Sequence, residues 1–205
     1  GDPSRAAAIL VNSGNSNAFT GKNGINAVEA ITSTVTSITG IPQSRVFTSS
    51  TGVIGEPLAH DRITAKIAEL HGAQTPDGIA EAAKAIMTTD TFAKGASAEV
   101  MVNGEPVKIA GIAKGSGMIA PDMATMLVYI FTDGLIGQDG LQSLISSSNA
   151  KTFNCITVDS DTSTSDTLIA AATGASGVDV TDNVDFATAL HSVMEDLAHL
   201  VVRDG

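Results

Sequence analysis

The sequence predicts a mixed α/β fold in which helices cover a sheet in one layered domain. Short apolar runs bounded by turn residues, typical of buried strands, alternate with stretches in which apolar residues recur every three or four positions, as in helices. Of the 205 residues, 43% are hydrophobic and 16% are charged, a balance that indicates a globular chain. No internal repeat or low-complexity linker is visible, so we expect a single domain over residues 1–205.

The first half of the chain alternates predicted strands and helices. Apolar runs predict strands over residues 6–12 and 45–50, the first stopped by the turn-rich residues 13–17 and the second by a turn at 50–52. Pro57 stands where the first turn of a helix accepts proline. The helices expected from apolar spacing or alanine content cover residues 25–38, 58–70 and 78–87.

The second half begins with a predicted hairpin. Strands over residues 99–102 and 107–112 flank Asn103-Gly104, a pair typical of tight hairpin turns. Residues 126–131 form a further apolar strand. The remaining predicted helices cover residues 141–145 and 185–201, the second with apolar residues on one face.

Composition excludes several classes of function. The net charge is −11 and only 11 residues are basic, so a nucleic-acid partner is not expected. No apolar run reaches the roughly 18 residues of a membrane helix, and no basic leader precedes an apolar stretch. The one cysteine, Cys155, excludes an intrachain disulfide and is expected to be a small buried apolar residue. We therefore expect a soluble, cytoplasmic protein.

Thr125 is the candidate nucleophile. It follows a turn rich in Gly and Pro and precedes an apolar strand, with Lys114 on a glycine-flanked turn upstream. If the bond between Ala124 and Thr125 is cut, Thr125 gains an α-amine that acts as a base for its own hydroxyl. Taken alone, however, Thr125 is simply a β-branched residue that opens a strand.

Two other polar segments carry groups that could take part in chemistry. The Thr51 hydroxyl and the Gly52 N–H form a candidate oxyanion hole, although Ser50-Thr51-Gly52 also fits an ordinary turn between a strand and a helix. Residues 159–166 carry three aspartates among hydroxyls, but they lack the calcium-loop pattern and are expected to form a turn or cap. The four histidines show no ligand spacing, so no metal site is predicted.

Several short segments stand out together, in order along the chain. They are NSGNSNA at 12–18 followed by Thr20-Gly21, STGVIG at 50–55, MTTDT at 87–91, KGSGMIAPDMATML at 114–127 and ITVDSDTSTSDT at 156–167. Together they resemble the glutamate N-acetyltransferase/ornithine acetyltransferase family of arginine biosynthesis, the ArgJ family. The resemblance spans essentially the whole chain, and the 114–127 block is its most specific part.

The resemblance implies a sheet-and-helix fold of the ArgJ/DmpA-like type and an enzyme that cuts its own precursor between Ala124 and Thr125. The two fragments would stay associated and pair into an α2β2 heterotetramer. Residues 1–124 would correspond to the C-terminal part of the α chain, and residues 125–205 to the N-terminal part of the β chain. Family members are longer at both ends, so this chain is expected to be truncated at both.

The implied reaction is acetyl transfer from N-acetylornithine to glutamate through an acetyl-Thr125 intermediate. Thr51 and Gly52 match the oxyanion-hole pair of the family, and Thr88 and Lys114 match substrate-binding positions beside Thr125. The resemblance implies no cofactor, with acetyl-CoA as a further candidate acetyl donor.

Two alternatives stay open. A self-processing amidohydrolase on a related scaffold would resolve the acyl-enzyme with water instead of glutamate. A catalytically silent fragment would use its apolar helix faces for folding or assembly only.

Overall fold

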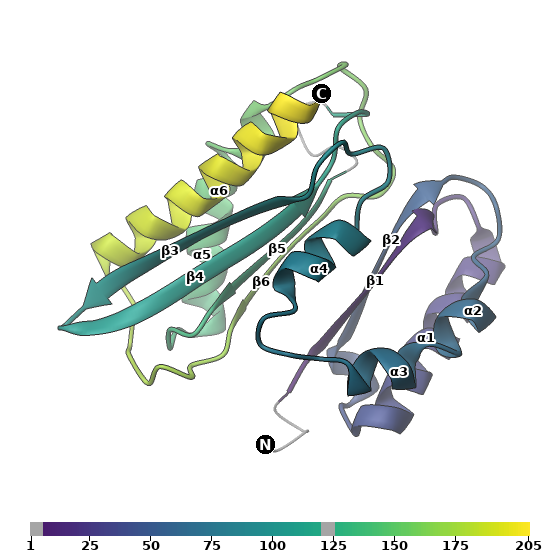
Figure 1. Cartoon of the computed structure of the whole chain (residues 1–205), viewed down its shortest axis with the longest axis horizontal. Coiled ribbons are helices and arrows are strands. Elements are labelled where there is room, and N and C mark those ends of the chain that lie inside the picture. The colour runs from purple at the N-terminus through teal and green to yellow at the C-terminus, as the bar shows by residue number, and fades with distance from the viewer. Residues whose placement is uncertain (1–5, 120–125) are drawn as a thin grey trace. The chain divides into compact units, whose positions relative to one another are not determined.

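The computed structural model describes residues 6–119 and 126–205 and confirms the mixed α/β class. The chain divides into two compact units, Gly1–Thr88 and Thr89–Gly205 (Figure 1). Each unit has a sheet of its own and a separate apolar core. Within the described residues, none of the helices combines the length and apolar character that crossing a membrane requires.

The first unit is built on a two-stranded parallel sheet of β1 (Ala8–Asn15) and β2 (Val46–Val53). The long helix α1 (Gly21–Thr39) connects the two strands and packs on β2. The remaining elements of this unit are η1 (Gln43–Arg45), α2 (His60–Thr64), α3 (Ile67–Gly72) and α4 (Ile79–Ala85).

The core of the first unit forms where α1 meets β2 and the short helices. Its buried residues recur on one face of α1 at the three-and-four spacing that predicted this helix. They are joined by side chains from β2 and from the chain that follows it. The cluster consists of Ala27, Ile31, Val35, Val46, Leu58 and Ile67.

Three details of the first unit differ from the sequence prediction. The turns expected at 13–17 and 50–52 are wrong in part, because both strands continue as polar strands to Asn15 and Val53. The Ser50 hydroxyl donates to Asn12 Oδ1 at 2.6 Å and links these polar ends. The helix expected over 58–70 is two short helices, and Pro57 precedes the first of them instead of lying in its first turn.

The second unit contains a four-stranded sheet in the order β3-β4-β5-β6. The predicted hairpin is confirmed and longer than expected, with β3 (Lys94–Val102) antiparallel to β4 (Glu105–Lys114). The predicted third strand is β5 (Leu127–Thr132), antiparallel to β4. The edge strand β6 (Thr167–Ala172) runs parallel to β5 and was missed, because its alanines give little of the apolar signal of a strand.

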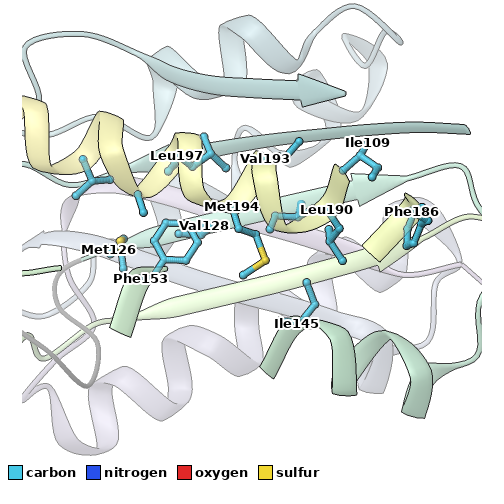
Figure 2. Close-up of a cluster of buried hydrophobic side chains, with 14 of the residues drawn as sticks. Ile109, Met126, Val128, Ile145, Phe153, Phe186, Leu190, Val193, Met194 and Leu197 are labelled. Carbon is cyan, nitrogen blue, oxygen red and sulfur yellow. The ribbon is translucent and has the colours of Figure 1, made fainter. Parts of the chain in front are cut away.

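Helices cover one side of this sheet (Figure 1). The predicted helices are confirmed with longer bounds as α5 (Gln138–Asn149) and α6 (Val184–Asp204), and a short 3₁₀ helix, η2 (Phe153–Cys155), follows α5. Figure 2 shows Leu190, Val193 and Leu197 of α6 directed into the core beside strand residues such as Ile109 and Val128. The helix α6 packs on β3 and β4 and thereby fixes the strand that ends at Lys114.

Cys155 corrects a further expectation. It is exposed instead of buried, and its thiol donates to the Ala150 carbonyl at 3.1 Å. The apolar neighbour that fills the core at this point is Phe153, which is 1% exposed. The bulky aromatic ring occupies the buried position of the 3₁₀ helix, so the smaller thiol faces outward.

Candidate active site

Lys114 stands where β4 leaves the sheet. It is the last residue of that strand and lies in register with Leu127, the first residue of β5. The lysine is only 2% exposed, which is rare for this residue type and requires a compensating partner. The fold therefore places a buried cation at the two strand ends that flank the segment with the predicted nucleophile.

Asp90 is the carboxylate at the centre of the surrounding charge cluster. Its side chain is fully buried and accepts a hydrogen bond from Lys94 Nζ at 2.7 Å. It also accepts from the backbone N–H of Gly115 at 2.6 Å, and its Oδ2 lies 3.8 Å from Lys114 Nζ. One carboxylate thus holds the residue after Lys114 and faces two buried ammonium groups.

Asp204, near the end of α6, completes the cluster. Its carboxylate is 1% exposed and lies 2.5 Å from Lys94 Nζ, and it accepts hydrogen bonds from the hydroxyl and the backbone N–H of Thr91. Burial raises the pKa of Asp204, but the hydrogen bonds from Lys94 and Thr91 outweigh that effect and leave the pKa lowered. The carboxylate is therefore stabilised in its charged form.

Opposing effects act on the pKa of Lys114. Burial lowers its pKa most strongly, the nearby Asp90 carboxylate raises it, and Lys94 lowers it, so that the net pKa lies below its usual 10.5. Lys114 is farther from Asp90 than Lys94 is, at 3.8 Å against 2.7 Å. Of the two lysines, Lys114 is therefore the one whose charge Asp90 compensates less.

Thr51 and Gly52 lie in the first unit, within β2. Thr51 is 1% exposed, and Gly52 has a φ of +130° and lies in register with Gly14 of β1. A Cβ atom at Gly52 would lie 2.3 Å from the carbonyl carbon of Gly14, so this position admits only glycine. The predicted oxyanion-hole pair is therefore held in a polar parallel ladder, not in the turn that the sequence suggested.

The other predicted site residues are distributed as follows. Thr88 is exposed in the bend after α4, at the last position of the first unit. Ala124 and Thr125 lie outside the described residues. The structure thus gathers charged residues around Lys114 in the second unit and places Thr51, Gly52 and Thr88 in the first.

Two of the three aspartates in residues 159–166, Asp159 and Asp166, accept hydrogen bonds from backbone N–H groups. Asp159 accepts from the N–H groups of Met118 and Ile119 at 2.6 Å and 2.8 Å, and these bonds lower its pKa. Asp166 accepts from the N–H of Met126 at 3.0 Å. Burial raises the pKa of Asp166, against the opposing effect of that bond. Residues 159–166 thus form an irregular loop with bends, and its aspartates accept from the neighbouring backbone instead of capping a helix. Residues 6–119 and 126–205 contain no group of three or more His, Cys, Asp or Glu residues that could hold a metal ion.

Sequence reasoning missed Asp90, Lys94 and Asp204 as members of the site. The spacing of four between Asp90 and Lys94 was available as a weak signal, but it also occurs in solvent-exposed pairs. Lys94 and Asp204 are 110 positions apart, and only the docking of α6 on β3 brings them together. A separate cleft of about 500 Å³ between α5 and the start of α6 contains none of the predicted site residues.

Comparison with known proteins gives a consistent result. The model of the ArgJ family matches residues 2–205. The arginine biosynthesis bifunctional protein ArgJ of Ruegeria pomeroyi is 67% identical over 199 residues, which cover 97% of this chain and 49% of that protein. The protein of the same name from Gluconobacter oxydans is 51% identical over 206 residues, covering 98% of this chain and 49% of the relative.

A solved structure is also similar. The crystal structure of arginine biosynthesis bifunctional protein ArgJ from Bacillus halodurans is 41% identical, with a TM-score of 0.50, and the match covers 56% of this chain and 61% of that chain. The chain spans about half the length of the curated relatives it matches.

Proposed function

The chain belongs to the ArgJ family, and from this membership we propose that the complete gene product transfers an acetyl group from N-acetylornithine to glutamate in arginine biosynthesis. The observation that carries the proposal is the 67% identity, over 97% of this chain, to a protein named arginine biosynthesis bifunctional protein ArgJ. The geometry around Lys114 supports it, because a buried cation at a strand end suits an anionic amino-acid substrate.

The first proposed step is self-cleavage between Ala124 and Thr125. Water is consumed across the peptide bond, so that Ala124 gains a carboxylate and Thr125 gains a free α-amine. That amine accepts the proton of the Thr125 hydroxyl, which is otherwise a weak nucleophile. The two fragments correspond to residues up to 124 and residues from 125, and we propose that they stay together in an α2β2 assembly.

Acetyl transfer then follows in two half-reactions. Thr125 Oγ attacks the acetyl carbonyl of N-acetylornithine, the C–N bond breaks, and ornithine leaves with the proton on its amine. The amine of glutamate attacks the resulting acetyl ester, which regenerates the hydroxyl and forms N-acetylglutamate. We propose that the Thr51 hydroxyl and the Gly52 N–H stabilise the oxyanion in both steps, since removing one oxyanion-hole donor from a serine protease costs about 2.7–4 kcal/mol.

Lys114 and Thr88 are the proposed substrate-binding residues. Lys114 would attract the α-carboxylate that both amino-acid substrates carry, and its Nζ lies 3.8 Å from Asp90, farther than the 2.7 Å of Lys94. Nothing in this sequence of steps calls for a metal or an organic cofactor, and acetyl-CoA is a further proposed acetyl donor. The proposed location is the cytoplasm.

The test measures acetyl exchange by the complete gene product. Wild-type protein with N-acetylornithine and glutamate should form N-acetylglutamate and ornithine in equal amounts, and Thr125→Ala should form neither. Thr188→Ala is the matched control, because Thr188 is exposed and its hydroxyl donates to the Val184 carbonyl within α6. Full exchange activity in Thr125→Ala would refute the assignment of the nucleophile.

The rate at which the acetyl-enzyme decays separates transfer from hydrolysis. Under the proposal, glutamate accelerates loss of the acetyl group and appears as the acetylated product. A decay rate that is independent of glutamate, with free acetate as the product, would identify an amidohydrolase instead. A protein that never becomes acetylated would identify a silent assembly module.

A further inference from the structure

Residues 157–167 contact the chain on both sides of the predicted cleavage bond. Asp159 accepts hydrogen bonds from the backbone N–H groups of Met118 and Ile119 at 2.6 Å and 2.8 Å. Asp166 receives the N–H of Met126 at 3.0 Å, and Met126 is the residue that follows Thr125. The two carboxylates therefore hold the last described residues before that bond and the first described residue after it.

Backbone hydrogen bonds reinforce both contacts. The N–H of Val158 donates to the carbonyl of Ile119 at 2.8 Å, and the N–H of Thr167 donates to the carbonyl of Met126 at 3.0 Å. Ile119 and Met126 are also buried, at 0% and 1% exposure. Each of these two residues is thus fixed by its N–H, its carbonyl and its side chain.

The carboxylates matter because they supply the strong part of this attachment. A hydrogen bond from a backbone N–H to an ionised carboxylate is roughly twice as strong as a neutral one. Met118 has a φ of +56°, a conformation that non-glycine residues adopt only when the surroundings enforce it. The bond from its N–H to Asp159 is the contact that holds it there.

We propose that Asp159 and Asp166 are positioning residues for the reactions of Thr125, an inference that rests on the proposed function. Asp159 fixes the chain on the side that becomes the α fragment. Asp166 fixes the second residue of the β fragment, so its hydrogen bond persists after cleavage. Asp159 therefore serves self-cleavage, whereas Asp166 serves both self-cleavage and acetyl transfer.

The experiment follows cleavage of the complete gene product by intact mass spectrometry after synthesis. Asp159→Ala and Asp166→Ala should each slow cleavage by on the order of tenfold to a hundredfold, the range expected when a hydrogen bond to a charged group is lost. Asp166→Asn keeps an acceptor oxygen and should restore cleavage to within a few-fold of wild type. Asp161→Ala is the matched control, because Asp161 is an exposed aspartate of the same segment. This variant should be cleaved at the wild-type rate.

A second readout separates positioning from general destabilisation. Once cleaved, Asp159→Ala protein should transfer acetyl groups at the wild-type kcat, while Asp166→Ala protein should show a lower kcat with KM unchanged. Asp159 is exposed, so its variant tests the inference even if Asp166→Ala does not fold. Wild-type cleavage rates in both alanine variants, or equal slowing by Asp161→Ala, would overturn the inference while leaving the proposed function intact. Wild-type protein that is never cleaved would refute the proposed function itself.

Discussion

Replacing Asp90 with alanine should destabilise the second unit strongly. The side chains of Asp90 and Lys94 are both fully buried and their charges lie 2.7 Å apart. At an effective dielectric constant of about 20, that attraction is about 6 kcal/mol, although desolvation of both groups offsets much of it. Removing one partner of a buried pair typically costs about 3–5 kcal/mol. Here Lys94 would keep the Asp204 carboxylate, but it would lose Asp90, and Lys114 would lose the carboxylate that lies 3.8 Å from its Nζ. Gly115 would lose its acceptor as well.

Urea denaturation of this chain, followed by tyrosine fluorescence, measures the effect directly. Tyr129 is the only tyrosine, tryptophan is absent, and Tyr129 lies 2% exposed in β5, so the signal reports on the second unit. We expect Asp90→Ala to lower the free energy of unfolding by about 3–5 kcal/mol, and Asp90→Asn to lower it less because an acceptor for Gly115 remains.

The matched control is Glu81→Ala. Lys84 and Glu81 are also 2.7 Å apart, but their side chains are 62% and 76% exposed, so the loss should stay within about 1 kcal/mol. Far-ultraviolet circular dichroism reports on that pair in the first unit. A loss below about 1 kcal/mol for Asp90→Ala, matching the exposed pair, would refute the reasoning that burial makes this cluster costly to break.

Three further predictions concern other parts of the chain. Gly52→Ala should cost at least about 3 kcal/mol in the free energy of unfolding, since its Cβ would lie 2.3 Å from Gly14 in a strained backbone conformation. Gly55 is also at positive φ, but a Cβ atom added there would lie within 4 Å of no heavy atom in the described residues beyond its two chain neighbours, so Gly55→Ala should cost about 1–2 kcal/mol. Equal losses of unfolding free energy in the two variants, measured by circular dichroism, would contradict the steric argument. Asn183→Ala should cost about 1 kcal/mol by tyrosine fluorescence, because Asn183 Oδ1 accepts from Phe186 at the start of α6, and an unchanged midpoint would argue against the cap. Lys114→Met should stabilise the second unit at neutral pH. The folded state lowers the pKa of Lys114 below 10.5, so the cost of its charge is present below the folded-state pKa and is relieved as pH rises toward the unfolded value. The gain in the free energy of unfolding from Lys114→Met should therefore become smaller as pH rises, when urea denaturation is measured at a series of pH values. A gain that stays constant or grows with pH would contradict this prediction.

Elements with a local signal were predictable from the sequence. The helices α1 and α6 bury residues at the spacing that the sequence displays, and the β3–β4 hairpin turns at Asn103-Gly104, both at positive φ. The polar ends of β1 and β2 were not predictable in this way. Their contacts, such as Ser50 with Asn12, join residues 38 positions apart and replace the apolar pattern with hydrogen bonds.

The candidate site likewise contains residues that the local sequence predicts and residues that only tertiary packing brings together. Lys114 was recognised from its glycine-flanked block, but its buried partners depend on tertiary packing, as the separation of 110 positions between Lys94 and Asp204 illustrates. The aspartates at 159 and 166 were visible as an acidic cluster. Their role in binding backbone N–H groups depends on tertiary packing, which brings the chain near Met118 and Met126 beside them. The roles of Thr51, Gly52, Thr88 and Thr125 in catalysis stay predictions.

The central claim is that Thr125 is both the product of self-cleavage and the carrier of the acetyl group. Intact mass spectrometry of the complete gene product, before and after brief mixing with N-acetylornithine alone, tests it most directly. We expect two fragments divided before Thr125, an acetyl group on the fragment that begins with Thr125, and loss of that group when glutamate is added. A single uncut chain that still transfers acetyl groups, or an acetyl group carried on another residue, would contradict it.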